Sequence, residues 1–210
     1  MVPAIDLTQW EIRYWQDHYL VAGVDEVGRG PLAGPVVAAV VIFEPGQVID
    51  GINDSKKLSA LQRERLYPQI LDQARAVGIG SVGVGDIEII NILEASRLAM
   101  RRALWQLPEV PDVVLTDGMQ LGGPWREVAI LYGDAVSASV GAASIVAKVV
   151  RDRYMQEIDQ QYPKYGFAQH KGYGTRQHQA ALLQFGPCPE HRLTFLRRLL
   201  SSNRVASQDA

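Results

Sequence analysis

The chain has 210 residues, of which 47% are hydrophobic, so it is long enough for one domain or two small ones with a real core. Its formal net charge of −2 excludes a molecule that is basic overall, and any surface that binds nucleic acid has to be local. The single cysteine, Cys188, excludes an internal disulfide framework and a cysteine-rich zinc site, and it fits a reducing compartment.

Neither a targeting segment nor a membrane segment is expected. The first residues lack the basic and apolar regions of a signal peptide. The longest apolar run, 36–43, is far shorter than the ~20 residues that a membrane-spanning helix needs. These features predict a soluble, cytoplasmic protein.

Apolar periodicity and turn residues predict helices alternating with strands. In chain order, we expect a helix at 6–20, strands at 20–25 and 35–43, a helix from 59, a strand at 76–85, a helix at 89–107, strands at 112–116 and 125–132, and helices at 137–160, 175–185 and 189–200. The first two strands should pair antiparallel, because only a short glycine loop joins them. The pattern predicts an α/β fold, in which a mixed sheet is flanked by helices and followed by a helical C-terminal cap.

We expect a single domain over 1–210. Its parts are an N-terminal helix, a core, a C-terminal helical region and a tail, at 1–19, 20–160, 161–200 and 201–210. No internal repeat, low-complexity block or linker divides the chain.

Capping residues and one proline refine the early helices. Asp6 or Thr8 can cap the first helix, and Ser59 with Gln62 forms a capping box at the start of the second. Pro68 should kink this second helix or divide it in two.

The third long helix should begin after Asp86, which can cap it. Its buried side is expected to carry Ile89, Leu93, Met100 and Leu104.

Acidic residues stand where three apolar runs end. Asp25 and Glu26 follow the first strand, while Asp117 and Asp134 follow the two later ones, each with a glycine nearby. If these strands are neighbours, four carboxylates converge on one sheet edge, where they repel unless protons or cations lie between them. All-oxygen ligation selects Mg²⁺ or Mn²⁺, and two such ions can activate a water at a phosphodiester. Taken singly, Asp117 or Asp134 is more simply interpreted as a turn residue.

A glycine-framed arginine, Gly28-Arg29-Gly30, follows the first acids at once. Glycine lets the main chain approach a ligand closely, and bare backbone amides can bind an anion. A tight turn between paired strands would need one glycine but not the whole run.

Several further segments surround these residues. They read VAGVDEVGRGPLAGPVVAAVVI, DSKKLS, NIL.A…AM, LTDG, GDAVSASVGAASIVAKVVRDRYM, HKGYGT..H and GP.PEHR.TF. Together they resemble the ribonuclease HII family over nearly all of 21–195. The resemblance implies a ribonuclease-H-like fold and an endonuclease that cuts 5′ to ribonucleotides in RNA–DNA hybrids or in duplex DNA, leaving a 3′-hydroxyl and a 5′-phosphate. Such an enzyme removes ribonucleotides during replication and repair.

The same resemblance assigns the metal site. It implies that Asp25, Glu26, Asp117 and Asp134 are the catalytic acids and hold two Mn²⁺ or Mg²⁺ ions.

It also assigns residues to the nucleic-acid substrate. Gly28-Arg29-Gly30 and Tyr173 match the loop and the tyrosine that contact the ribonucleotide's 2′-hydroxyl, the one group that distinguishes RNA from DNA there. Without the resemblance, an exposed loop tyrosine is more simply a packing residue.

Basic and polar residues are expected to form a phosphate track. Asp54, Ser55 and Lys56 match a DSK segment of the family, in which Ser55 and Lys56 should hold phosphates. Without the resemblance, the lysines at 56–57 are more simply a solvated face. Lys148 and Arg151 share one face of the long helix, and further charge comes from Arg192, Arg197 and Arg198.

Two positions depart from the family pattern. Tyr132 and Val136 stand where the family usually has lysines beside the fourth acid, which predicts a different affinity or salt sensitivity. His170, His178 and His191 have no recognised zinc spacing, which favours structural or phosphate-contact roles.

Three alternative functions remain to be tested. A dinucleotide-binding oxidoreductase would use Gly28-x-Gly30 and Gly34, but its fingerprint needs a helix after the loop, and here Pro31 and Pro35 lead into a strand. A catalytically inactive nucleic-acid-binding module could share the fold. Ribonuclease HIII would bring an extra N-terminal domain, whereas about twenty residues precede the first strand here. We expect a monomer.

Overall fold

The computed structural model describes residues 7–47, 49–53 and 55–197. Three features of the sequence interpretation lie outside them, namely the possible cap Asp6, the residues Asp54 and Arg198, and the tail at 201–210. Among the described residues, no helix is long and apolar enough to cross a membrane.

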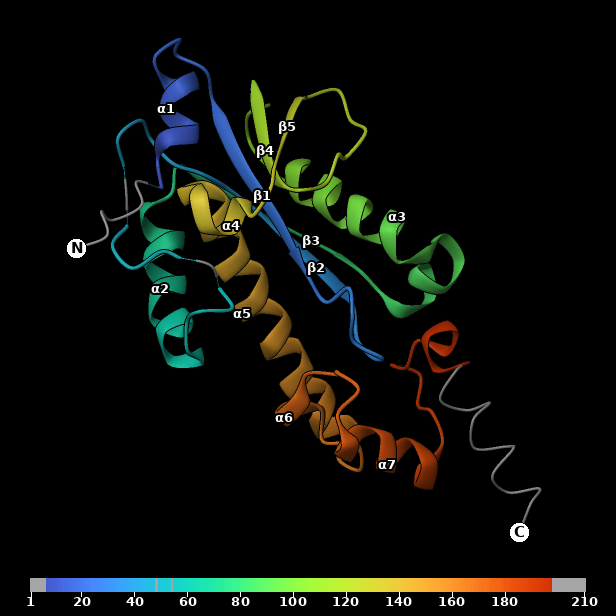
Figure 1. Cartoon of the computed structure of the whole chain (residues 1–210). Helices are drawn as coiled ribbons and strands as arrows, with labels where there is room; N and C mark the ends of the chain where they lie inside the picture. The colour runs from blue at the N-terminus through green and yellow to red at the C-terminus, as the bar shows by residue number, and fades with distance from the viewer. Residues whose placement is uncertain (1–6, 48, 54, 198–210) are drawn as a thin grey trace.

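A five-stranded mixed sheet with the order β3-β2-β1-β4-β5 forms the centre of the structure (Figure 1). The strands are β1 (Val21–Val27), β2 (Val36–Ile42), β3 (Ala76–Val82), β4 (Val113–Asp117) and β5 (Arg126–Ile130). Strand β1 pairs antiparallel with β2, as expected, and parallel with β4, which pairs parallel with β5. The carboxyl ends of β1, β4 and β5 therefore meet at one edge of the sheet.

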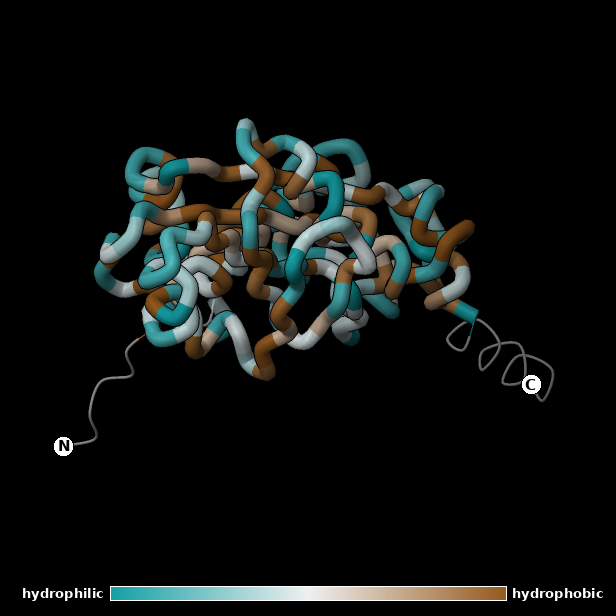
Figure 2. The backbone as a smooth tube through the Cα atoms, turned by 90° about the horizontal axis from the view of Figure 1, so that it is seen from above, coloured by the Kyte–Doolittle hydropathy of each residue, from teal (hydrophilic) through white to brown (hydrophobic). Residues whose placement is uncertain are grey.

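Helices cover both faces of this sheet (Figure 1). The helices are α1 (Gln9–Trp15), α2 (Ala60–Gln73), α3 (Val84–Leu104), α4 (Gly133–Val136), α5 (Ala138–Gln161), α6 (Phe167–His170) and α7 (Arg176–Phe185). One hydrophobic cluster joins α1, α2 and α5 to the sheet, and a second joins α3 to the opposite face. Successive residues of β2 belong alternately to the two clusters. Ala39 and Val41 pack in the first, and Ala38 and Val40 pack in the second. In Figure 2 the apolar stretches accordingly run through the middle of the molecule.

A buried carboxylate attaches the N-terminal helix to the start of α5. Glu11 is fully buried, and its Oε1 accepts hydrogen bonds from the hydroxyls of Ser137 and Ser139, both at 2.6 Å, and from the Ser139 amide at 2.9 Å. An anion at a helix N-terminus is favoured by the helix dipole. The contact fixes the junction between α5 and α4, the short helix that carries Asp134.

Helix α2 begins as predicted but is not divided at its proline. The capping box of Ser59 and Gln62 is confirmed, and α2 runs as one helix through Pro68, so the expected division into two helices is wrong. Pro68 lies on the exposed side, where the carbonyl that loses its partner can bind water.

In α3 the predicted buried face is wrong for its first half. Ile89 is 82% exposed and Leu93 is 40% exposed, while Met100 and Leu104 are buried as expected. Asn91 breaks the helix with φ 66° and ψ 167°, and its Oδ1 accepts from the amides of Leu93 and Glu94. The break shifts the helical phase, so a single face cannot be extended across it.

The C-terminal helices also differ in part from expectation. Thr175 caps α7 as predicted. The last helix does not open at Pro189: helical residues begin at 193, because His191 forms a β-bridge with Ala33. The glycine loop after β1 leads into strand β2 and not into a helix, so the dinucleotide-binding alternative fails.

Candidate active site

The four acids of the sequence analysis gather at the edge where β1, β4 and β5 end. The register pairs Val24 of β1 with Thr116 of β4, so Asp25 and Asp117, one residue further along, are neighbours. Asp134 follows β5 within the short helix α4, which replaces the expected turn. Asp117 Oδ1 accepts a hydrogen bond of 2.8 Å from the Gly133 amide, which ties the end of β4 to the start of α4.

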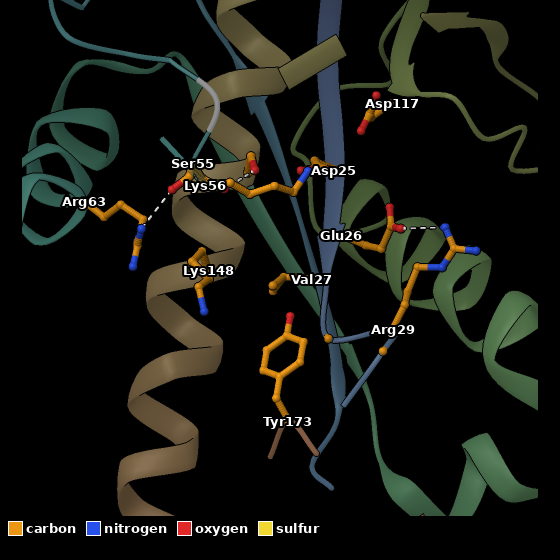
Figure 3. Close-up of a pocket in the computed structure, with 13 residues that line it drawn as sticks. Asp25, Glu26, Val27, Arg29, Ser55, Lys56, Arg63, Asp117, Lys148 and Tyr173 are labelled. Carbon is orange, nitrogen blue, oxygen red and sulfur yellow. Dashed lines mark hydrogen bonds and ion pairs between the residues drawn. The ribbon is translucent and has the colours of Figure 1, made fainter. Parts of the chain in front are cut away.

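A cavity of about 470 Å³ opens over these acids (Figure 3). Its lining residues are Asp25, Glu26, Val27, Gly28, Arg29, Gly30, Ser55, Lys56, Arg63, Asp117, Ser144, Lys148 and Tyr173. Three of the four acids, the glycine loop, the tyrosine and the expected phosphate contacts Ser55, Lys56 and Lys148 thus share one cavity. Asp134 is buried and is not a lining residue. It forms an ion pair with Lys56, which lines the cavity, and Lys56 Nζ lies 3.3 Å from Asp134 Oδ2.

Burial makes the first two acids resist ionisation. Burial and then the charge of Glu26 hold the pKa of Asp25 well above its usual value, against a hydrogen bond from Ser144. Burial raises the pKa of Glu26 to about 7, against the opposing charge of Arg29. Arg29 Nη1 lies 3.2 Å from Glu26 Oε1. Removing protons from both acids at neutral pH therefore requires further positive charge.

The donor set fits hard divalent cations. Its donors are carboxylate oxygens, which Mg²⁺ and Mn²⁺ prefer, and Glu26 Oε2 is buried with no hydrogen-bond partner in the described part of the chain. No group of three or more His, Cys, Asp or Glu side chains among the described residues is arranged to hold an ion as it stands. Glu26 forms an ion pair with Arg29, and Asp134 forms one with Lys56. Each acid would have to exchange this partner for a metal ion.

The glycines of the loop divide into two kinds. Gly28 has φ +96°, and an added Cβ would lie 2.3 Å from Nε of Arg151, so packing itself requires this glycine. Gly30 has no such conformation, and an added Cβ would meet only the ring of Tyr173, at 3.9 Å. The space above Gly30 is open to the cavity, so a ligand's backbone can come close there.

Tyr173 stands across the cavity from the carboxylates and points its hydroxyl toward them (Figure 3). Its side chain is 44% exposed. Its main chain is held independently of the ring, because its amide donates to the His170 carbonyl at 2.9 Å and its carbonyl accepts from His178 Nδ1 at 2.9 Å.

The expected phosphate contacts lie on the side of the cavity formed by α2 and α5 (Figure 3). Ser55 and Ser144 share a hydrogen bond of 2.8 Å between their hydroxyls. Lys148 Nζ donates to Asp152 at 2.6 Å, and burial lowers the pKa of this lysine. Arg63, which the sequence analysis did not single out, donates to the Ser55 carbonyl at 2.8 Å. In the sequence, Arg63 could be singled out only by its position, one turn into the helix that follows the DSK segment.

Two arginines do not lie where a phosphate track would need them. Arg151 and Arg192 are fully buried, so neither can touch a substrate, and the expected direct contacts are corrected. Arg197 is exposed.

The three histidines form a buried cluster and are out of reach of phosphate. His170 and His178 stack with ring centroids 4.4 Å apart, and Nε2 of His178 lies 3.0 Å from Nε2 of His191. His178 Nδ1 donates to the Tyr173 carbonyl, so its Nε2 is the acceptor and His191 donates. Of the two roles left open by the sequence, the structure places them in the structural one.

Comparisons with known proteins identify the family of the chain. A family model described as Ribonuclease HII matches residues 22–200. The chain is 55% identical to Ribonuclease HII 1 of Methylibium petroleiphilum over 84% of this chain and 89% of that one. It is 56% identical to Ribonuclease HII of Albidiferax ferrireducens over 86% of this chain and 88% of that one. The crystal structure of the ribonuclease H2 from Pyrococcus horikoshii superposes with a TM-score of 0.72 at 28% identity, covering 88% of this chain and 98% of that one.

Proposed function

This chain belongs to the ribonuclease HII family, a family of type 2 ribonuclease H endonucleases, and from that premise we propose how it acts. It hydrolyses the phosphodiester on the 5′ side of a ribonucleotide, in an RNA–DNA hybrid or in duplex DNA with an embedded ribonucleotide. The products are a 3′-hydroxyl and a 5′-phosphate. The observation that carries the proposal is that three of the four acids, the glycine loop and Tyr173 line one cavity.

The acids are proposed to hold the metal ions. Asp25, Glu26, Asp117 and Asp134 would hold two Mg²⁺ or Mn²⁺ ions. When bound, such ions lower the pKa of the attacking water and neutralise charge on the departing 3′-oxygen. The raised pKa values of Asp25 and Glu26 and the unpartnered Glu26 Oε2 support this assignment.

Recognition of the ribonucleotide is proposed for the glycine loop and the tyrosine. The amides of Arg29 and Gly30 can approach the sugar and its phosphate, because Gly30 presents no side chain. Tyr173 faces them across the cavity and can pack on the ribose. Together they would detect the 2′-hydroxyl that an all-DNA duplex lacks.

The cations beside the acids are proposed to position the strand. Lys56, Lys148 and Arg63 line the same cavity and would contact phosphates without reading sequence. A local basic wall of this kind allows a chain of net charge −2 to bind a polyanion.

We also propose that the chain acts as one domain and as a monomer in a reducing cytoplasm. The continuous sheet supports the single domain, and the single free cysteine, Cys188, supports the reducing compartment. Its oligomeric state can be measured by size-exclusion chromatography with light scattering.

The decisive experiment is cleavage of a labelled DNA duplex that carries one ribonucleotide, with Mn²⁺, Mg²⁺ or EDTA. We expect one metal-dependent nick 5′ of the ribonucleotide and none in the all-DNA duplex. A polymerase should extend the upstream product, since it would end in a 3′-hydroxyl. Tight binding without cleavage under either metal would instead support a binding module of the same fold.

A further inference from the structure

The glycine loop rests on two buried arginines. Arg151 comes from α5, and Arg192 precedes the last helical residues. Both have 0% exposure, and neither forms an ion pair among the described residues. A buried charge is costly unless its hydrogen-bonding groups are satisfied. The partners of these two guanidiniums therefore show what the fold requires of them.

Arg192 uses all five of its N–H donors on the loop. Nε and Nη2 both donate to the Gly34 carbonyl, at 3.0 and 2.7 Å. Nη2 also donates to the Gly28 carbonyl at 2.6 Å, and Nη1 donates to the carbonyls of Arg29 and Pro31, both at 3.0 Å. Only a guanidinium offers five donors in a fixed plane.

Arg151 holds the far end of the same loop. Its Nε donates to the Pro35 carbonyl at 2.9 Å, and its Nη2 donates to the Ala33 carbonyl at 3.1 Å. Its Nη1 donates at 3.0 Å to the carbonyl of Lys171, two residues before Tyr173. One side chain thus joins the glycine loop to the tyrosine loop.

Most carbonyls of the loop accept hydrogen bonds from the two arginines, so the loop has amides rather than carbonyls to offer a ligand. The amides of Leu32 and Gly34 donate to the carbonyls of Gly172 and Glu190. In the described part of the chain, the amides of Arg29 and Gly30 donate to no acceptor, and both residues line the cavity.

We propose that Arg151 and Arg192 are positioning residues for ribonucleotide recognition. They bind the carbonyls of loop 28–35 on the side away from the substrate, so that the loop is ordered before binding and the amides of Arg29 and Gly30 face the substrate. The proposal rests on the proposed function. A loop that is ordered before binding does not lose conformational entropy on binding, so the arginines act on substrate affinity without touching the substrate. Burial and the neighbouring charge of Arg151 lower the pKa of Arg192 to about 9, so the Arg192 guanidinium remains charged at neutral pH and favours an anion at the loop.

The test uses Arg192→Lys and Arg151→Lys in the full chain. Lysine keeps the charge but has three donors at one point and cannot span several carbonyls. Arg153→Lys is the matched control, since Arg153 is an exposed residue of α5 that pairs with Glu64. Thermal unfolding checks that each variant is folded.

The first readout needs no substrate. Hydrogen exchange at the Leu32 and Gly34 amides should be at least tenfold faster in Arg192→Lys than in the wild type and in Arg153→Lys. The second readout is kinetics on the duplex with one ribonucleotide, where KM should rise about tenfold while kcat changes less than threefold.

Unchanged exchange in the folded variants, or faster exchange with an unchanged KM, would overturn the proposal. If Arg192→Lys does not fold, hydrogen exchange and kinetics are measured in Arg151→Lys, and the same outcomes support or overturn the proposal. If neither folds, the arginines are folding elements and the proposal is wrong. A wild type that fails to cut the duplex would refute the proposed function, while the exchange measurement would still decide whether the arginines order the loop.

Discussion

Lys56 Nζ lies 3.3 Å from Oδ2 of Asp134, although 77% of the lysine side chain and only 5% of the aspartate side chain are exposed. The lysine therefore reaches from solvent to a buried acid. Arg29 has the same relation to Glu26, because 49% of the arginine side chain and 8% of the glutamate side chain are exposed. The chain's own cations thus balance two of the proposed metal ligands, and both pairs would have to open when an ion binds.

Asp117→Asn and Asp134→Asn should each lower the cleavage rate by at least roughly a hundredfold, because charge stabilisation by a bound metal ion is worth several kcal/mol. Asparagine keeps an oxygen that can accept the Gly133 amide at position 117, so folding and duplex binding should survive. Rates are measured with Mn²⁺ and Mg²⁺, and binding by fluorescence anisotropy in EDTA. Asp86→Asn, on the exposed end of α3, is the control and should cut at the wild-type rate. Full activity in either site variant would contradict the assignment.

Gly28→Ala and Gly30→Ala should fail in different ways. Alanine at position 28 has to adopt a left-handed conformation, which costs about 1–2 kcal/mol, and to displace Arg151, so we expect a loss of stability in urea unfolding. Alanine at position 30 has room in the free protein and should change stability by less than about 1 kcal/mol. Its methyl group would stand where the substrate approaches, so kcat/KM on the ribonucleotide duplex should fall at least tenfold. The opposite pattern would show that Gly30 serves the fold.

Tyr173→Ala should impair recognition far more than stability. The ring is 44% exposed and its main chain is held by His170 and His178. Loss of an aromatic packing surface costs on the order of 1–3 kcal/mol per nucleotide contact, or roughly ten- to a hundredfold. The measurement is kcat/KM together with urea unfolding. Tyr19→Ala, at the opposite end of β1 and 38% exposed, should change neither the rate nor the nick position. An unfolded Tyr173→Ala would show that the ring serves packing.

The sheet and its acid-bearing edge could be predicted from local signals. Runs of Val and Ala between glycine turns mark β1 and β2, and each acid stands where an apolar run ends. Whether the acid-bearing strands are neighbours stayed open in the sequence, because β1 pairs with residues about ninety positions away in β4. The strands and the acids at their ends are local features, and the sequence pattern carries those.

Other features depend on contacts that no local pattern carries. The buried face of α3 changes at Asn91, whose left-handed conformation is invisible to helical periodicity. Arg151 shares a helical face with Lys148, which favoured exposure, yet its carbonyl partner Pro35 is 116 residues away in the sequence. Burial of an arginine by a distant loop can be found only once the loop is placed.

Glu11→Ala should destabilise the fold by about 2–4 kcal/mol, because it leaves the Ser137 and Ser139 hydroxyls without their acceptor and removes an anion from the N-terminus of α5. Glu11→Gln keeps one acceptor oxygen and should lose less. Urea unfolding measures both. Glu64→Ala removes an exposed ion pair with Arg153 and should cost no more than about 1 kcal/mol. Equal losses of unfolding free energy in Glu11→Ala and Glu64→Ala would mean that the buried contact stabilises the fold no more than an exposed ion pair does.

The buried pair of His178 and His191 should make the protein less stable in mild acid. Burial lowers the pKa of each to about 4, whereas in the unfolded chain histidine titrates near 6.5. As pH falls from about 6.5 toward 4, the unfolded chain binds protons that the folded chain cannot, so stability present above pH 6.5 is progressively lost. Each histidine should account for about 1–2 kcal/mol between pH 7 and pH 5.

The measurement is the free energy of unfolding in urea at pH 7, 6 and 5. In His191→Gln the amide can still donate to Nε2 of His178, but it cannot titrate, so the decline with pH should be shallower than in the wild type. His18→Gln, which alters an exposed histidine, serves as the control. Protonation of His178 occurs at Nε2 and leaves its Nδ1–H bond to the Tyr173 carbonyl intact, so the contact that should open first is the one between the two histidines. An equal pH dependence in wild type and His191→Gln would show that this pair does not control acid stability.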